Sequence, residues 1–291
     1  MATLQRPPRA MPAGGPNCLA NPAGGANFFR AKQTDMETKA KIVANWLPRY
    51  TGVPLKNFGR YILLTNFDRY VEQFAHWHRV PVHGRNKPMT SATAGGITII
   101  NFGMGSATAA TVMDLLSAIK PEAVLFLGKC GGLKHRAKLG SLILPIAAIR
   151  GEGTSNDYFP PEVPALPAFA LQKAISTTIR EHKRDYWTGT IYTTNRRVWE
   201  HDTDFKRYLK KVRAIAVDME TATIFITGFA NEISTGALLL VSDEPMTPEG
   251  VKTAASDETV DHKHVSMHLR IGIDSLKQLI NKGVTVKHLK F

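Results

Sequence analysis

The chain has 291 residues, of which 43% are apolar and 21% charged, an ordinary globular composition that can bury a core without disulfides or metals. No apolar run approaches the ~18–20 residues of a bilayer span, so we expect neither a membrane-spanning helix nor a membrane partner. The formal net charge of +13 favours an anionic partner, either a polyanion or a phosphorylated small molecule. Cys18 and Cys130 are too few for a disulfide framework and are typical of a reducing compartment, so we expect a cytoplasmic location.

Residues 1–34 differ in composition from everything that follows. Their charged residues are all basic, and prolines and glycines interrupt the segment repeatedly. So little apolar surface does not offset the entropy of ordering, and we therefore expect a flexible N-terminal extension followed by one domain over residues 35–291. A transit peptide is the less favoured alternative, because the prolines and glycines disrupt an amphipathic helix.

From residue 35 onward, apolar runs of strand length alternate with stretches of helical periodicity. In chain order we predict helix 35–49, strand 61–65, helix 68–77, strand 97–102, helix 106–119, strand 123–127, strand 141–149, helix 168–182, strand 189–193, helix 203–211, strand 214–217, helix 220–231, strand 236–241 and helix 260–281. This alternation indicates an α/β fold whose largely parallel sheet is covered by helices.

Glycines or polar residues follow five of the predicted strands, where parallel sheets bind their ligands. These segments are 103–106, 128–132, 194–197, 218–220 and 242–243. Because the carboxyl ends of parallel strands meet at one edge, we expect the five segments to form one site. Gly103-Met104-Gly105 before a helix is consistent with a phosphate-binding loop or with a simple tight turn.

Two acidic strand ends are the most informative. Glu220 follows an apolar strand and could accept hydrogen bonds from vicinal ribose hydroxyls, while the alternative is that Asp218 and Glu220 only cap a helix. Asp243 ends a fully apolar strand, so burial should raise its pKa and suit it to general acid catalysis. The alternative for Asp243 is an Asx turn.

Two other site types are disfavoured. His262, His264 and His268 share a predicted helix, but no Glu lies between them as in the zinc motif H-E-x-x-H, so we expect no metal site. The basic residues of 206–213 lie near no aromatic platform or nucleic-acid-binding motif, so they form a solvated face and no nucleic-acid partner is expected.

Taken together, these motifs resemble the nucleoside phosphorylase/hydrolase superfamily. The shared segments are Gly103-Met104-Gly105, Gly128-x-Cys130-Gly131-Gly132, Val217 to Ala222, and Val241-Ser242-Asp243. Segments 49–52, 64–67, 159–164 and 189–200 narrow the resemblance to the catalytic domain of bacterial AMP nucleosidases. The resemblance implies a three-layer αβα sandwich of the nucleoside phosphorylase type, cleavage of AMP by water to adenine and ribose 5-phosphate, and no cofactor.

The resemblance also implies a role for each matching residue. Asp243, beside Ser242, would protonate purine N7, and Glu220 would hold the ribose hydroxyls. The remaining substrate-binding candidates are Met219, Met104, Gly105, Cys130 and Gly131 along the nucleoside, Trp199 over the purine, and Arg197, Lys129 and Arg196 at the 5′-phosphate.

Departures from the family pattern bear on the nucleophile. Phosphorolytic relatives have an arginine and a serine where this chain has Phe126 and Lys129, which favours water over phosphate. The base that activates water is open, with Asp68 as a candidate in the first strand's loop. Larger members carry an N-terminal regulatory domain for which this chain has no room, so we do not expect their regulation by ATP and phosphate.

Three hypotheses remain at this point: an AMP nucleosidase, a phosphorylase or hydrolase of unphosphorylated nucleosides, and a non-catalytic nucleotide- or nucleic-acid-binding protein. Because binding alone does not require an acid at N7, Asp243 and Glu220 disfavour the third. The resemblance further implies a homo-oligomer, most simply a hexamer.

Overall fold

The computed structural model describes residues 38–247, 250–253, 258, 260 and 262–282. The predicted extension over residues 1–34 lies outside these residues. Within them, no helix is sufficiently long and apolar to cross a membrane.

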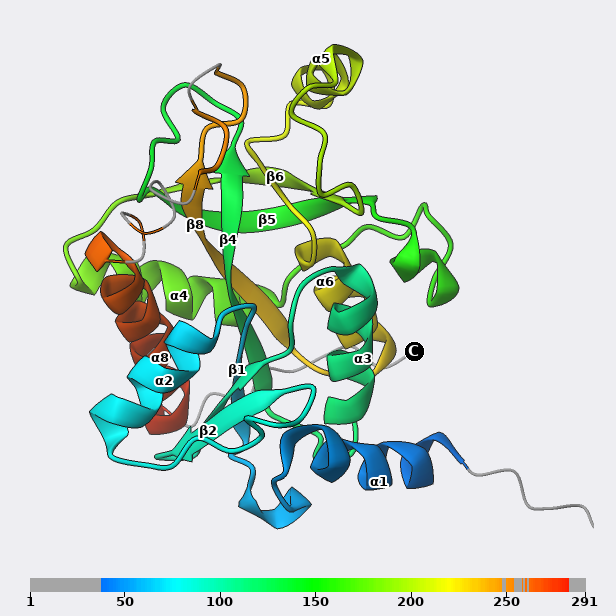
Figure 1. The fold of residues 1–291 in the computed structure, drawn as a ribbon, viewed down its shortest axis with the longest axis vertical. Helices are drawn as coiled ribbons and strands as arrows, with labels where there is room; N and C mark the ends of the chain where they lie inside the picture. Colours follow the sequence, from blue (N-terminus) through cyan, green and yellow to red (C-terminus); the bar gives the residue numbers. More distant parts are fainter. Residues whose placement is uncertain (1–37, 248–249, 254–257, 259, 261, 283–291) are drawn as a thin grey trace, which may run out of the picture. The chain divides into compact units, whose positions relative to one another are not determined.

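The described strands form one mostly parallel sheet (Figure 1). They are β1 (Tyr61–Thr65), β2 (Thr90–Ala94), β3 (Ile97–Asn101), β4 (Ala123–Gly132), β5 (Leu142–Gly151), β6 (Tyr186–Thr194), β7 (Ala216–Asp218) and β8 (Thr235–Asp243). Their order is β2-β3-β1-β4-β7-β6-β5-β8, and β8 also pairs with β4. This extra pairing closes β4, β7, β6, β5 and β8 into a ring. β4 and β8 run parallel, so their carboxyl ends meet.

Helices cover both faces of the sheet, which confirms the three-layer prediction (Figure 1). On one face lie α1 (Lys39–Thr51), α3 (Ser106–Leu116) and α6 (Thr221–Ala230), and on the other α2 (Asp68–His78), α4 (Phe169–Glu181) and α8 (Val265–Lys282). Each group of helices encloses its own cluster of buried apolar side chains against the sheet. The short helices η1 (Leu55–Asn57) and η2 (Thr154–Asp157) and the amphipathic α5 (Thr203–Lys211) lie in the connections.

The structure differs from the sequence-based prediction at two glycine pairs. Strand β4 does not end at residue 127 but continues to Gly132, because its glycines allow close packing: a Cβ at Gly132 would lie 2.5 Å from the Ala137 carbonyl oxygen. The edge strand β2 was not predicted at all. It forms a hairpin with β3 through Gly95 and Gly96, whose φ values of 56° and 78° suit a two-residue hairpin turn.

Candidate active site

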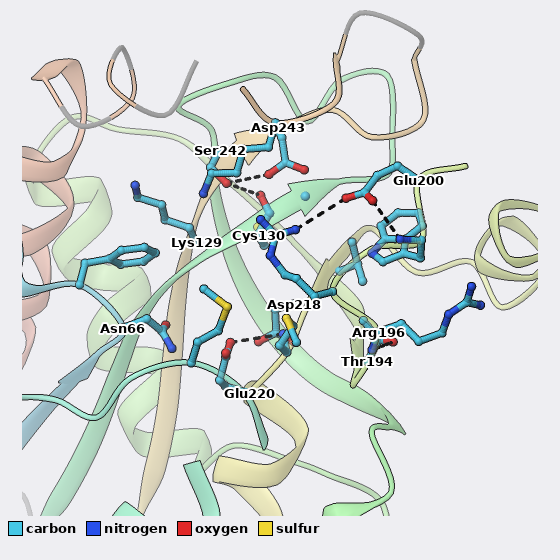
Figure 2. A pocket seen from close by; sticks show the side chains of 18 residues that line it. Asn66, Lys129, Cys130, Thr194, Arg196, Glu200, Asp218, Glu220, Ser242 and Asp243 are labelled. Atoms are coloured by element: carbon cyan, nitrogen blue, oxygen red, sulfur yellow. Dashed lines mark hydrogen bonds and ion pairs between the residues drawn. The ribbon is translucent and has the colours of Figure 1, made fainter. Parts of the chain in front are cut away.

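One pocket opens where β1, β4, β6, β7 and β8 end, at the edge that the strand-end pattern predicts (Figure 2). The predicted site residues that line it are Met104, Lys129, Cys130, Gly131, Arg196, Arg197, Trp199, Met219, Glu220, Ser242 and Asp243. Segments of the chain more than a hundred residues apart are thus brought together. Gly105 and Asp68 are the predicted site residues outside this lining.

Asp243 lies at one end of the pocket, at the tip of β8 (Figure 2). Pairing between β4 and β8 is irregular here, since Cys130 pairs with Val241 and Gly131 with Asp243, which leaves Ser242 as an extra residue. Such a bulge turns the following side chain toward the site. The Ser242 hydroxyl donates to Asp243 Oδ1 at 2.7 Å and lies 3.5 Å from the Cys130 carbonyl oxygen.

The surroundings of Asp243 favour its protonated form. Burial raises the pKa of its carboxyl group, and the negative charge of Glu200 acts in the same direction. The Ser242 hydrogen bond and the charges of Lys252 and Arg197 lower the pKa in part, but the net shift is upward. A Cβ at Gly131 would lie 3.0 Å from Asp243 Oδ2, so glycine keeps the space beside this carboxyl group open.

Glu220 lies at the opposite end, in the N-cap position of α6 (Figure 2). Its Oε1 accepts a hydrogen bond from the Gly105 amide at 2.7 Å, and its Oε2 accepts one from the Met219 amide at 3.3 Å. Gly105 does not line the pocket but orients this carboxylate from the turn before α3. Burial, and then the charge of Asp218, raise the pKa of Glu220 to about 8, against these two amides and Arg197.

Asp218 caps a helix, which was one of the two interpretations of the acidic pair Asp218 and Glu220. Its side chain is buried, accepts from the Thr193 hydroxyl at 2.7 Å and from the Thr221 amide at 2.8 Å, and so caps the first turn of α6. Both acids line the pocket, but the Asp218 carboxyl group is engaged by the helix and by Thr193, while Glu220 is held by the Gly105 and Met219 amides.

The three predicted phosphate-binding cations are placed differently. The Arg196 guanidinium pairs with Asp202 at 2.8 Å and lies over the Phe205 ring at 5.1 Å, which directs it toward α5. Arg197 remains at the pocket, where its charge acts on both Glu220 and Asp243 and its Nη1 lies 3.8 Å from Glu200. In Figure 2 the Arg196 side chain extends away from the labelled acids.

Lys129 and Trp199 are both buried in the pocket wall. The Lys129 ammonium lies 4.3 Å from the centroid of the Phe67 ring. Trp199 is only 5% exposed and packs edge-on against Phe205 at 5.3 Å, so one side of the indole belongs to a small apolar cluster.

Asp68 does not belong to the pocket. It starts α2, and its Oδ1 accepts hydrogen bonds from the side chains of Thr90 and Asn101, the latter at 2.9 Å. These partners lie on β2 and at the end of β3, and neither is among the residues that line the pocket. The candidate water-activating role of Asp68 is therefore not retained.

Sequence reasoning missed four further lining residues, Asn66, Phe67, Glu200 and Lys252. Asn66 and Phe67 directly follow β1, so the strand-end rule that found the other segments would also have found them. Lys252 follows a turn with no motif, and its proximity to Phe67, at 5.9 Å from ring to ammonium, exists only in the folded chain.

The described residues contain no group of three or more His, Cys, Asp or Glu side chains that could hold a metal ion. His268 is fully buried, with Nδ1 2.9 Å from the Tyr70 hydroxyl and Nε2 2.9 Å from the Leu238 carbonyl oxygen. Burial lowers its pKa to about 4, so at neutral pH it is an uncharged packing residue.

The raised pKa of Glu220 predicts a pH-dependent cost in stability. Because the folded state holds this proton up to about pH 8 while the ordinary pKa is 4.5, stability is lost as pH rises between the two values. Glu220→Gln has no titrating group at this position, so its melting temperature should fall less than that of the wild type between pH 5 and pH 9. The difference should be roughly 2–4 °C for each kcal/mol of stability that the wild type loses. Thermal denaturation measures this. Equal pH dependence of Glu220→Gln, the wild type and the exposed control Glu162→Gln would contradict it.

Comparison with known proteins places these features in a family. The sequence profile of the phosphorylase superfamily matches residues 60–282. The crystal structure of AMP nucleosidase from Bacteroides thetaiotaomicron VPI-5482 is 54% identical, with a TM-score of 0.76, and the match covers 85% of this chain and all of that one. Uridine phosphorylase from Vibrio fischeri ES114 shares the fold at 21% identity and a TM-score of 0.68, over 78% of this chain and 94% of its own.

The AMP nucleosidase of Escherichia coli (strain K12) is 28% identical in an alignment of 284 positions. The match covers 81% of this chain and 58% of that protein. The chain therefore spans a little more than half the length of this relative. The family profile covers most of the residues that build the sheet and the pocket, and the Bacteroides relative matches along its whole length. This chain belongs to the phosphorylase superfamily, in the branch that contains the AMP nucleosidases.

Proposed function

We propose that this chain is an N-glycosidase that hydrolyses AMP to adenine and ribose 5-phosphate. The observation that carries the proposal is one pocket with a partly buried carboxyl group of raised pKa, Asp243, at one end and a buried, amide-held carboxyl group, Glu220, at the other. The 54% identity to a Bacteroides AMP nucleosidase supports the same activity. In this proposal the purine lies toward Asp243 and the ribose toward Glu220.

At the purine end, Asp243 acts as the general acid. Cleavage of the glycosidic bond leaves negative charge on the purine, and a proton delivered to N7 neutralises it. Ser242 orients the carboxyl group through its 2.7 Å hydrogen bond, and the backbone of Cys130 and Gly131 runs along the base. Trp199 covers part of the ring.

At the sugar end, Glu220 accepts hydrogen bonds from the ribose hydroxyls. The sugar becomes cationic as the bond breaks, so Glu220 in its ionised form stabilises the transition state more than the bound substrate. Because the pKa of Glu220 is raised to about 8, this contribution grows as the pH approaches that value. Met219 and Met104 pack against the sugar. Met104 is 53% exposed at the pocket, so its side chain is accessible to a ribose there.

The 5′-phosphate requires several donors, for which a guanidinium is suited. We propose Arg197 as the principal ligand and Lys129 as a secondary one, because both line the pocket. Arg196 is the less suitable candidate, since its guanidinium is paired with Asp202.

Water is the proposed nucleophile. Phe126, which stands where phosphorolytic relatives have an arginine, is fully buried, and its ring packs against Phe102 at 5.8 Å. Because this position holds a phenylalanine, it offers no cation to bind inorganic phosphate. Its absence supports hydrolysis over phosphorolysis. Phosphorolysis of an unphosphorylated nucleoside is the alternative, as in the uridine phosphorylase that shares the fold.

A direct assay separates these functions. The protein is incubated with AMP, adenosine or inosine, with and without inorganic phosphate, and free base is quantified by chromatography. We expect adenine from AMP at a rate that phosphate does not raise. Phosphate-dependent release of base from adenosine or inosine would instead identify a nucleoside phosphorylase, and no base release from any substrate would leave a binding protein.

We also propose that the protein is a homo-oligomer, with a hexamer as the expected form. Four large apolar side chains are exposed around β5, β6 and the start of α4: Ile146, Leu166, Phe169 and Trp187. Phe169 is 81% exposed, which an isolated monomer would leave in water at a cost of about 25 cal/mol per Å². Sedimentation equilibrium at micromolar concentration should give a multiple of 32.0 kDa, and a mass near that of one chain would contradict the proposal.

A further inference from the structure

Glu220 is held in place by a residue that is itself held by others. The amide of Gly105 donates to Glu220 Oε1 at 2.7 Å, and Gly105 adopts a φ of 96° just before α3. A backbone amide at a glycine turn can hold a carboxylate only if the turn is fixed. The geometry of Glu220 thus depends on what fixes residues 105 and 106.

Ser106, the residue after Gly105, anchors this turn and is not among the residues that line the pocket. Its side chain is buried, and its hydroxyl donates to Asn195 Oδ1 at 2.6 Å and lies 2.7 Å from the Thr154 hydroxyl. Because a serine hydroxyl has one proton, donation to Asn195 leaves Thr154 as the donor of the second bond. Ser106 is therefore fixed both by η2 and by the segment that follows β6.

Asn195 connects the turn to a buried acid. Its side-chain amide donates to the backbone carbonyl of Glu152, at the end of β5. The carboxylate of Glu152 is 2% exposed and accepts from the amides of Gly153, at 2.8 Å, and Ser155, at 3.1 Å. An acid buried this deeply is costly unless its oxygens are satisfied, so its retention calls for a role.

The last bond returns to the helix that carries Glu220. The hydroxyl of Thr223, in the first turn of α6, donates to Glu152 Oε1 at 2.8 Å. A closed circuit results, from Glu220 through Gly105, Ser106, Asn195, Glu152 and Thr223 back to α6; we call Ser106, Asn195, Glu152 and Thr223 the Glu152 circuit. All four residues lie outside the lining of the pocket, so they act on a substrate only through Glu220.

We propose that the Glu152 circuit is a positioning device for Glu220: it fixes the glycine turn against the first turn of α6 and so sets how firmly Glu220 holds the ribose hydroxyls. This inference rests on the proposed function of Glu220 and deepens it. A fully satisfied buried network is rigid, and it loses that rigidity when one member is removed. The circuit spans the ends of β5 and β6 and the starts of α3 and α6, so it ties four elements to one carboxylate.

The circuit has a consequence beyond packing. The hydrogen bond from Gly105 stabilises the ionised form of Glu220 and lowers its pKa, against burial and the charge of Asp218. The Met219 amide and the positive charge of Arg197 also lower the pKa of Glu220. A looser turn would weaken the Gly105 bond, so the ionised form would appear only at higher pH.

Two threonines on α6 provide a matched test. Thr223 and Thr227 are both fully buried one turn apart, but the Thr227 hydroxyl donates to the Thr223 backbone carbonyl at 2.7 Å and has no contact with Glu152. Thr223→Val, Thr227→Val and Thr223→Ser are compared by the pH dependence of kcat/KM for AMP. Thr223→Val should lose roughly tenfold in kcat/KM and move the acidic limb upward by ~0.5–1 pH unit, as expected for a weakened support of a catalytic carboxylate. Thr227→Val and Thr223→Ser should retain the wild-type limb.

A second variant keeps the test decisive if Thr223→Val does not fold. Ser106→Ala removes the bond to Asn195 at the other end of the circuit and should shift the acidic limb in the same direction. An unchanged limb in the folded variants, or equal effects of Thr223→Val and Thr227→Val, would overturn the inference.

The positioning role can be measured apart from the activity. If the wild type releases no adenine, the proposed function fails, but the titration of the Glu220 carboxylate remains accessible by difference infrared spectroscopy against Glu220→Gln. A higher midpoint in Thr223→Val than in Thr227→Val then supports the circuit by itself. Equal midpoints would contradict it whatever the substrate.

Discussion

Asp243→Asn is expected to abolish adenine release from AMP while AMP still binds. The amide keeps the shape of the carboxyl group and its hydrogen bond to Ser242, but it cannot deliver a proton to purine N7. Loss of a general acid is typically worth ~10²–10⁴-fold in rate, so kcat should fall by that factor. Steady-state kinetics measure the fall, and calorimetric titration with AMP shows that binding is retained.

A matched Asp→Asn change elsewhere separates this effect from a general loss of charge. Asp274, on α8, pairs with His182 at 2.9 Å and neither residue lines the pocket, so Asp274→Asn should leave kcat unchanged. Near-normal turnover by Asp243→Asn would remove Asp243 from the mechanism. A parallel fall in both variants would show that the lost rate reflects folding instead.

Arg197→Ala is expected to separate AMP from adenosine as substrates. If Arg197 holds the 5′-phosphate, its removal costs a charge-assisted hydrogen bond, about 1.5–3 kcal/mol, or roughly one to two decades in kcat/KM for AMP. The same variant should lose far less on adenosine, which lacks the phosphate. Parallel measurement of kcat/KM on both substrates gives the ratio.

The neighbouring arginine is the control for that ratio. The Arg196 guanidinium is occupied by Asp202, so Arg196→Ala should affect AMP and adenosine alike and only slightly. Because Arg197 also acts electrostatically on Asp243 and Glu220, some loss on adenosine is compatible with the phosphate role. An equal loss on both substrates would show that Arg197 tunes the two acids and that the phosphate is held elsewhere.

The sequence predicted the regular elements well where local signals were strong. Helix Thr203–Lys211 begins and ends as predicted, because Asp202 caps it by accepting from the Phe205 amide at 2.9 Å. β1 also has its predicted bounds, since a short apolar run between polar residues leaves little choice of ends. The strand-end rule then found most of the pocket lining, because a parallel sheet makes ligand sites from segments that follow strands.

The parts that the sequence did not predict depend on contacts between distant segments. Asp68 follows β1 like a site residue, yet its carboxylate accepts from Thr90 and Asn101, and none of the three lines the pocket. The glycines after residue 127 indicated a turn, but the space they free lets β4 pair with β8 as far as Asp243. Glu152 gave no local signal, because its function depends on Thr223, seventy-one positions further along the chain.

If water cleaves AMP in this pocket, the sugar product carries only the phosphate that AMP brought, so the identity of that product is the sharpest test of the proposed hydrolysis. AMP is incubated with the protein in phosphate buffer, and the products are followed by ³¹P NMR together with chromatography of the base. We expect adenine and a sugar with a single phosphate, ribose 5-phosphate, formed at equal rates. A sugar carrying a second phosphate at C1 would show that phosphate is the nucleophile, and unchanged AMP would show that this chain does not cleave it.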